Sequence, residues 1–202
     1  MRRFTPQSTV LKLCLILLSF LLLSLSGCAS IEVIESWNKP NPIKGPYKKF
    51  MIIGVGHDEN VRAEVENILV VEFGNHGVDA VASHKMIREI DQARRADIAS
   101  AVHSTGADAV LTVRPVSKGN GNVTQDGESG GIYGTATNFG GSVLAGARTY
   151  SDAVLQTNLY DSASTELVWS ASLSTYDAER PARVSRDLAE FFLRTFRKNG
   201  FL

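Results

Sequence analysis

The sequence is poor in cysteine and has no excess charge of either sign. Two cysteines in 202 residues are too few for a disulfide-stabilised small scaffold or for a zinc site of four thiolates. Because 21 Lys and Arg residues balance 21 Asp and Glu residues, no overall positive field exists to attract nucleic acid. An apolar fraction of 44% argues against disorder, and the length fits one domain.

The first 27 residues combine a basic start with an apolar run. Arg2, Arg3 and Lys12 supply the basic part, and residues 13–25 are apolar apart from two serines. This composition is typical of a secretory signal, and the apolar run is shorter than the roughly 20 residues of a membrane-spanning helix. An uncleaved N-terminal anchor is the alternative.

The end of this segment carries a short motif. Leu25, Ser26, Gly27 and Cys28 resemble the lipobox of bacterial lipoproteins. In that family the Cys thiol receives a diacylglyceryl group, the chain is cut before the Cys, and the new amino terminus is acylated. The resemblance therefore implies lipidation at Cys28, with an anchor in membrane lipid that several acyl chains make effectively permanent. Because the next residue is Ala29 and not Asp, resemblance to Gram-negative lipoproteins implies the outer membrane, with the chain facing the periplasm.

Processing before Cys28 would change the composition. It removes Cys14, Arg2, Arg3 and Lys12 and no acidic residue, so 18 basic side chains remain against 21 acidic ones, a net charge of −3. Since the Cys28 thiol would be consumed as a thioether, the mature chain would hold no free thiol and no disulfide.

Residues 28–49 are predicted to be the lipidated Cys and a tether. Pro40, Pro42, Gly45 and Pro46 interrupt regular structure there. Fully extended, residues 29–46 would reach roughly 55 Å at about 3.1 Å per residue. Four apolar residues between positions 31 and 37 leave open that part of the tether docks on the domain or on lipid.

Residues 50–202 are predicted to form one α/β domain that opens with a βαβαβ unit. A continuous apolar run at 50–56 indicates a buried strand, and Asp58 and Asn60 can start the helix that follows it. The next expected elements are a strand at 78–82, one broken or two short helices at 84–105, and a strand at 108–113. Such a series implies parallel strands joined by helical crossovers.

The pattern then changes. Residues 119–146 hold nine of the 17 glycines, and an insertion at 119–150 is expected to be a floppy loop, a hairpin that a partner orders, or a bilayer-inserting hairpin. Two antiparallel strands at 152–160 and 167–175 and a helix at 181–198 complete the domain. The expected fold class is therefore α/β with a mixed sheet.

The order of these elements resembles a family of bacterial lipoproteins with a small periplasmic α/β domain of unknown function. The residues that carry this resemblance are Phe50–Val55, Arg62–Glu66, Gly77-Val78, Ser83, Gly106–Leu111, Leu159–Asp161 and Leu167–Ser170. More remotely, the architecture is similar to periplasmic domains of the curli secretion lipoprotein and of lipoprotein activators of penicillin-binding proteins. Those relatives assemble with other proteins. The resemblance implies no enzyme activity, no catalytic residues and no cofactor.

Several polar residues could carry chemistry. Gly54 and Gly56 follow a strand as in a dinucleotide-binding loop, but the third glycine is replaced by Glu59, so a tight turn is the better interpretation. His57 and Asp58 lie at a strand's carboxyl end and could line a ligand pocket, although a helix cap is the better interpretation of Asp58. No spacing of histidines predicts a metal site.

The remaining candidates have simple structural interpretations. Ser83 beside His84 is interpreted as a helix cap, because no nucleophile elbow surrounds the serine. Arg62 and Glu66 are expected to form a surface ion pair, with a buried role left open by the family pattern.

These observations favour a non-enzymatic interaction or assembly module of the cell envelope, with an envelope protein or a second copy of the chain as partner. A periplasmic protein that binds a small ligand or a glycan is the alternative, and a hydrolase is a remote one.

Overall fold

A computed structural model describes residues 31–40, 45–56, 58–116, 153–175 and 180–202. The signal, the lipobox, His57 and the glycine-rich insertion lie outside these residues. Six strands form one mixed sheet in the order β1-β6-β5-β4-β2-β3, so the predicted fold class is confirmed. In the part of the chain that the structure describes, no helix is long and apolar enough to cross a membrane.

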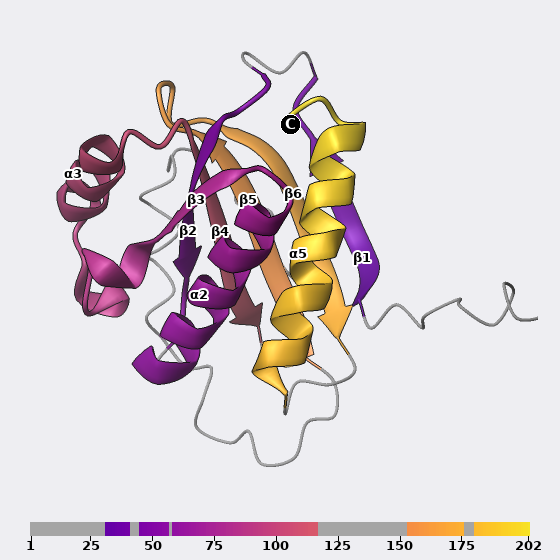
Figure 1. The fold of residues 1–202 in the computed structure, drawn as a ribbon, viewed down its shortest axis with the longest axis horizontal. Helices are drawn as coiled ribbons and strands as arrows, with labels where there is room; N and C mark the ends of the chain where they lie inside the picture. The colour runs from indigo at the N-terminus through magenta and orange to yellow at the C-terminus, as the bar shows by residue number, and fades with distance from the viewer. Residues whose placement is uncertain (1–30, 41–44, 57, 117–152, 176–179) are drawn as a thin grey trace, which may run out of the picture.

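The opening unit has the predicted topology. β2 lies between β3 and β4 and is parallel to both, and α2 provides the first crossover (Figure 1). The second crossover consists of two short 3-10 helices, η1 and η2, and the helix α3. The bounds are β2 (Lys49–Gly54), α2 (Glu59–Asn75), β3 (Asp79–Ala82), η1 (Ser83–Lys85), η2 (Ile90–Gln92), α3 (Arg95–Thr105) and β4 (Ala109–Val116).

The second half is antiparallel. β5 (Ala153–Asp161) pairs with β4 and with β6 (Leu167–Thr175), and α5 (Pro181–Lys198) follows. The predicted hairpin and C-terminal helix are therefore both confirmed. Pro115 lies within β4, one residue before its end, where the missing N–H of a proline is tolerated.

An edge strand occupies part of the expected tether. β1 (Ile31–Asn38) pairs antiparallel with β6, from Ile31 opposite Thr175 to Asn38 opposite Trp169. A bulge lies between Val33 and Glu35. The folded domain thus includes Ile31–Asn38. The sequence leaves open whether this segment docks on the domain or on lipid, and in the structure it pairs with the domain's own sheet.

The main core lies between one face of the sheet and the helices α2 and α5 (Figure 1). Aromatic side chains dominate it: the rings of Trp169 and Phe196 meet edge to face with centroids 5.3 Å apart, and Phe196 stacks on Phe50 at 5.9 Å. Trp169, at 1% exposure, is among the largest fully buried side chains. Aromatic pairs of this geometry contribute about 0.5–1.5 kcal/mol each beyond their burial.

A smaller core lies on the opposite face. Residues of α3 and of the 3-10 segment, among them Ile90, Ile98 and Val102, pack on Met51 and Val110 there. This cluster covers the part of the sheet formed by β2 and β4. The cluster also includes Tyr160 at one end of β5, and most of the other side chains of β5, β6 and β1 on this face are polar.

Candidate functional site

Asp58, which follows β2 and is predicted to line a ligand pocket with His57, caps the start of α2. The Asp58 carboxylate accepts hydrogen bonds from the backbone N–H groups of Asn60 (2.9 Å) and Val61 (3.2 Å). This satisfies two of the free donors at the start of α2, so the capping interpretation of Asp58 is confirmed. Its neighbour in the predicted pocket, His57, lies outside the described residues, and ligand binding at this place stays a prediction.

Glu66 is the centre of a buried polar network that the sequence analysis did not find. Its side chain is fully buried, and its two oxygens accept five hydrogen bonds. Oε1 accepts from the Gly54 N–H (2.8 Å), Arg62 Nε (3.0 Å) and the Ser83 hydroxyl (2.7 Å). Oε2 accepts from the N–H and the ring Nδ1 of His84, at 2.7 and 2.9 Å.

Arg62 completes this network. Its five N–H groups all donate: Nε to Glu66, Nη1 to Glu59 (2.6 Å) and the Arg88 carbonyl (3.2 Å), and Nη2 to the Ser83 hydroxyl (2.8 Å) and the Ile87 carbonyl (2.9 Å). The expectation of a surface ion pair is therefore wrong, and the buried role left open by the family pattern is the one the structure has. A guanidinium whose donors are all used ties α2 to the chain that follows β3, and this is a structural role.

Ser83 does not cap a helix, contrary to the sequence-based interpretation. Its hydroxyl donates to Glu66 and accepts from Arg62, and η1 has no side-chain cap. The His84 ring contacts the same carboxylate and keeps about a fifth of its side chain exposed. Because the serine bonds to carboxylate and guanidinium, these residues do not form the serine-to-imidazole bond of a hydrolase triad.

Gly54 allows this network to form. A Cβ at this position would lie 3.1 Å from Cγ of Arg62 and 3.5 Å from Cγ of Glu66. The glycine therefore lets α2 approach β2 closely enough for the Gly54 N–H to reach the buried carboxylate. The sequence suggests that Gly54 and Gly56 form a tight turn. The structure adds that Gly54 is needed for the close packing of α2 on β2.

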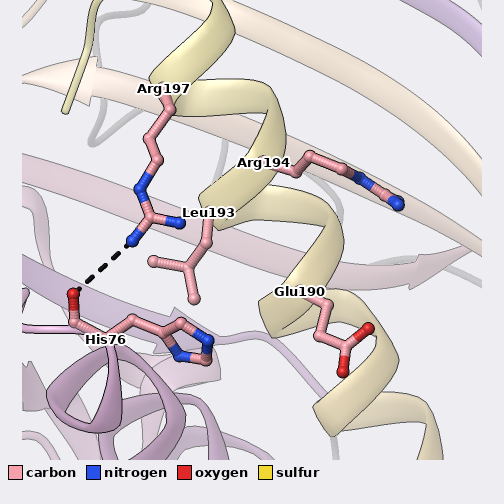
Figure 2. A pocket seen from close by; sticks show the side chains of 5 residues that line it. All are labelled: His76, Glu190, Leu193, Arg194 and Arg197. Atoms are coloured by element: carbon pink, nitrogen blue, oxygen red, sulfur yellow. Dashed lines mark hydrogen bonds between the residues drawn. The ribbon is translucent and has the colours of Figure 1, made fainter.

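An open pocket of about 320 Å³ lies at the other end of α2, against α5. Its lining is His76, Glu190, Leu193, Arg194 and Arg197. Figure 2 shows the His76 ring near Leu193, while the Arg194 guanidinium points away from it. Arg197 Nη2 is 3.5 Å from the His76 carbonyl, and His76 Nδ1 is 2.9 Å from the Glu72 carbonyl. The pocket combines both charge signs on exposed side chains.

A second candidate surface is the polar face of β5, β6 and β1. Paired residues share a face, so Trp37, Ser170 and Asn158 lie in one row across three strands. The next row holds Glu35, Ser172 and Gln156. Below, the residues of these two rows are called the polar sheet face.

The side chains of the polar sheet face hold one another in place. The Gln156 amide donates to Ser170 (3.0 Å) and Asn158 (3.3 Å) and accepts from the Ser172 hydroxyl (2.8 Å). On β4, burial lowers the pKa of the neighbouring Arg114 guanidinium from its ordinary value. Trp37 is 41% exposed at the sheet's edge. The face thus presents hydroxyls, amides, the Glu35 carboxylate and one aromatic ring on paired strands.

Comparisons with known proteins give a remote likeness in fold. No protein-family model and no curated protein matches the sequence. Among solved structures, the chain is similar to a dodecamer of a PelC variant from Paraburkholderia phytofirmans, with 12% identity, a TM-score of 0.44, and coverage of 78% of this chain and 94% of that one. A second PelC dodecamer from the same organism has 11% identity, a TM-score of 0.41, and coverage of 75% and 92%. At these values the likeness says nothing about what this chain binds.

Proposed function

We propose that this chain is a lipid-anchored, non-enzymatic binding protein of the bacterial outer membrane, whose domain faces the periplasm and binds an envelope component through the polar sheet face. The observation that carries the proposal is this face itself. It spans three strands and bears half-buried hydroxyl and amide groups, and none of its six residues belongs to either hydrophobic core cluster of the described residues.

The polar side chains that could act in catalysis already have hydrogen-bond partners within the domain, which supports a binding function over a catalytic one. Glu66, Arg62 and Ser83 hydrogen-bond to one another, and Asp58 caps α2. A nucleophile or general base needs a free lone pair aimed at a substrate, and the carboxylate of Glu66 already accepts five bonds.

The anchor is tested by substituting Cys28→Ala. We expect this variant to remain an unprocessed precursor and to incorporate no radiolabelled palmitate, whereas the unaltered chain is labelled and floats with outer-membrane fractions. A Cys14→Ala variant is the matched control and should be labelled normally, since Cys14 precedes the cleavage point. Normal processing and labelling of Cys28→Ala would contradict the anchor.

Binding through the polar sheet face is tested by site-specific photocrosslinking in intact cells. A photoreactive residue at Ser172 should give a discrete adduct, and the same residue at Ala163, in the exposed β5–β6 turn, should not. The substitution Gln156→Lys should abolish the Ser172 adduct. An adduct of twice the chain's mass would identify a second copy as the partner. Equal adducts at both positions, or none at Ser172, would contradict the proposal.

A glycan is a second candidate for the bound component. The specific observation is Trp37, an exposed ring in the same row as the Ser170 hydroxyl and the Asn158 amide. An aromatic face beside hydrogen-bonding groups suits a sugar ring, which has apolar C–H faces and hydroxyl edges. In a Trp169→Phe variant, Trp37 is the only indole, so its fluorescence should change on titration with periplasmic oligosaccharides. No change at saturating oligosaccharide would exclude this candidate.

A further inference from the structure

We infer that the domain rests directly on the bilayer through one corner, where β1 begins, β6 ends and α5 begins. This inference rests on the proposed lipidation of Cys28. The corner consists of Ile31, Val33, Ile34, Arg180, Arg183 and Arg186, and is called the anchor corner below. Figure 1 shows the start of β1, the end of β6 and the first turn of α5 at the same end of the domain.

The length of chain before β1 determines which end faces the membrane. Only Ala29 and Ser30 separate Cys28 from Ile31, the first residue of β1. Three residue steps span at most about 11 Å. The acylated Cys28 lies at the lipid surface, so Ile31 lies within about that distance of it. The roughly 55 Å reach expected of a flexible tether is unavailable, because β1 is paired with β6 along its length.

The pairing of β1 brings α5 to the same corner. Ile31 lies opposite Thr175, the last residue of β6, and α5 starts at Pro181. Arg180, Arg183 and Arg186 are exposed and belong to the residue before α5 and its first two turns. Arg186 is about 8 Å along the helix from Pro181. All three arginines therefore lie near the end of the domain that the anchor holds to the membrane.

The anchor corner carries exposed apolar side chains and arginines, both of which can contact phospholipid. Val33 and Ile34, at 44% and 58% exposure, are among the most exposed large apolar side chains of the described residues. Arginines near a membrane can bind headgroup phosphates, and each basic residue contributes about 1 kcal/mol on an anionic surface. Glu32 and Asp187, with Asp177 and Glu179 in the chain between β6 and α5, set four acidic residues against these three arginines, so the corner has no net positive charge and its exposed apolar side chains are the main contact expected with lipid. The inference assigns the corner to phospholipid and leaves the polar sheet face for the bound component.

The experiment uses the full lipidated protein in vesicles of phosphatidylethanolamine and phosphatidylglycerol. The mature chain has no free thiol if Cys28 is acylated, so a single new cysteine can carry an environment-sensitive fluorophore. We expect doxyl-labelled lipids to quench the fluorophore at Ile34→Cys and not at Ala163→Cys, in the turn between β5 and β6 at the opposite end of these strands.

Charge substitutions test the arginines. In the Ile34→Cys background, Arg183→Gln with Arg186→Gln should reduce the ratio of docked to undocked domain about fivefold per arginine. The matched control, Arg194→Gln with Arg197→Gln further along α5, should leave quenching unchanged. Protein that floats with the vesicles but shows no quenching at Ile34→Cys would overturn the inference alone. Protein that does not float would overturn the anchor, and the inference with it.

Discussion

Arg62 Nε donates a hydrogen bond of 3.0 Å to Oε1 of Glu66, and both side chains are almost completely buried, at 1% and 0% exposure. An ion pair in this position cannot be replaced by water if one partner is lost. It joins α2 to β2 through the Gly54 N–H and to η1 through Ser83 and His84. The pair therefore holds the first crossover of the domain together.

Neutralising the carboxylate should be strongly destabilising. Glu66→Gln leaves the buried Arg62 guanidinium with Glu59, which is 41% exposed, as its one carboxylate partner among the described residues. We expect a loss of about 3–5 kcal/mol in the free energy of unfolding, measured by urea denaturation. Glu64→Gln, on the exposed side of the same helix, is the control and should change stability by less than about 0.5 kcal/mol. Similar losses in the two variants would contradict this role.

A methyl group at Gly54 should disturb the same network. In Gly54→Ala the new Cβ would lie 3.1 Å from Arg62 Cγ, which is closer than carbon atoms normally pack. Overpacking of this kind costs about 1–3 kcal/mol, which thermal or urea unfolding would detect. Gly56→Ala is the matched control, because a Cβ there meets nothing within 4 Å. If Gly54→Ala unfolds like Gly56→Ala, the close approach of α2 to β2 is not required.

Hydrogen exchange should distinguish an edge strand from a tether at residues 31–38. In an edge strand, amides directed at β6 are bonded and exchange slowly, whereas amides on the outer side exchange quickly. We expect intermediate protection of a peptide from this segment by mass spectrometry, and much stronger protection of β5, which has strands on both sides. Exchange of every amide in 31–38 at the rate of an unfolded chain would contradict the strand.

Alkaline pH should destabilise the fold through Tyr47. Burial, together with the nearby Asp161 carboxylate, raises the pKa of this phenol well above its ordinary value of 10.0. Above pH 10 the unfolded chain therefore releases a proton that the folded chain retains, so stability falls as pH rises. The slope for this group reaches about 1.4 kcal/mol per pH unit. Tyr47→Phe should show a shallower decline between pH 10 and 11; an unchanged decline would contradict the assignment.

Local sequence patterns were sufficient for most of the fold. The apolar run at residues 50–56, the Asp58 cap and the alternation along residues 167–175 depend on neighbours in sequence, and the structure contains the corresponding elements. The pattern failed at Ser83, which looks like a cap by its position before a helical segment. Its hydroxyl bonds instead to residues of α2, which sequence spacing alone does not bring near.

The sequence by itself determined the mixed α/β class, the order of most elements and the position of the lipobox-like motif, because these depend on composition and short-range periodicity. Tertiary structure decided two features that local sequence patterns did not reveal. Two ion-paired residues four positions apart on a helix have the same spacing whether the pair is exposed or buried. Arg62 and Glu66 are buried because β2 and η1 pack against this side of α2. Likewise, Ile31–Asn38 forms a strand because β6 has a free edge to pair with, a partner more than a hundred residues away in the chain.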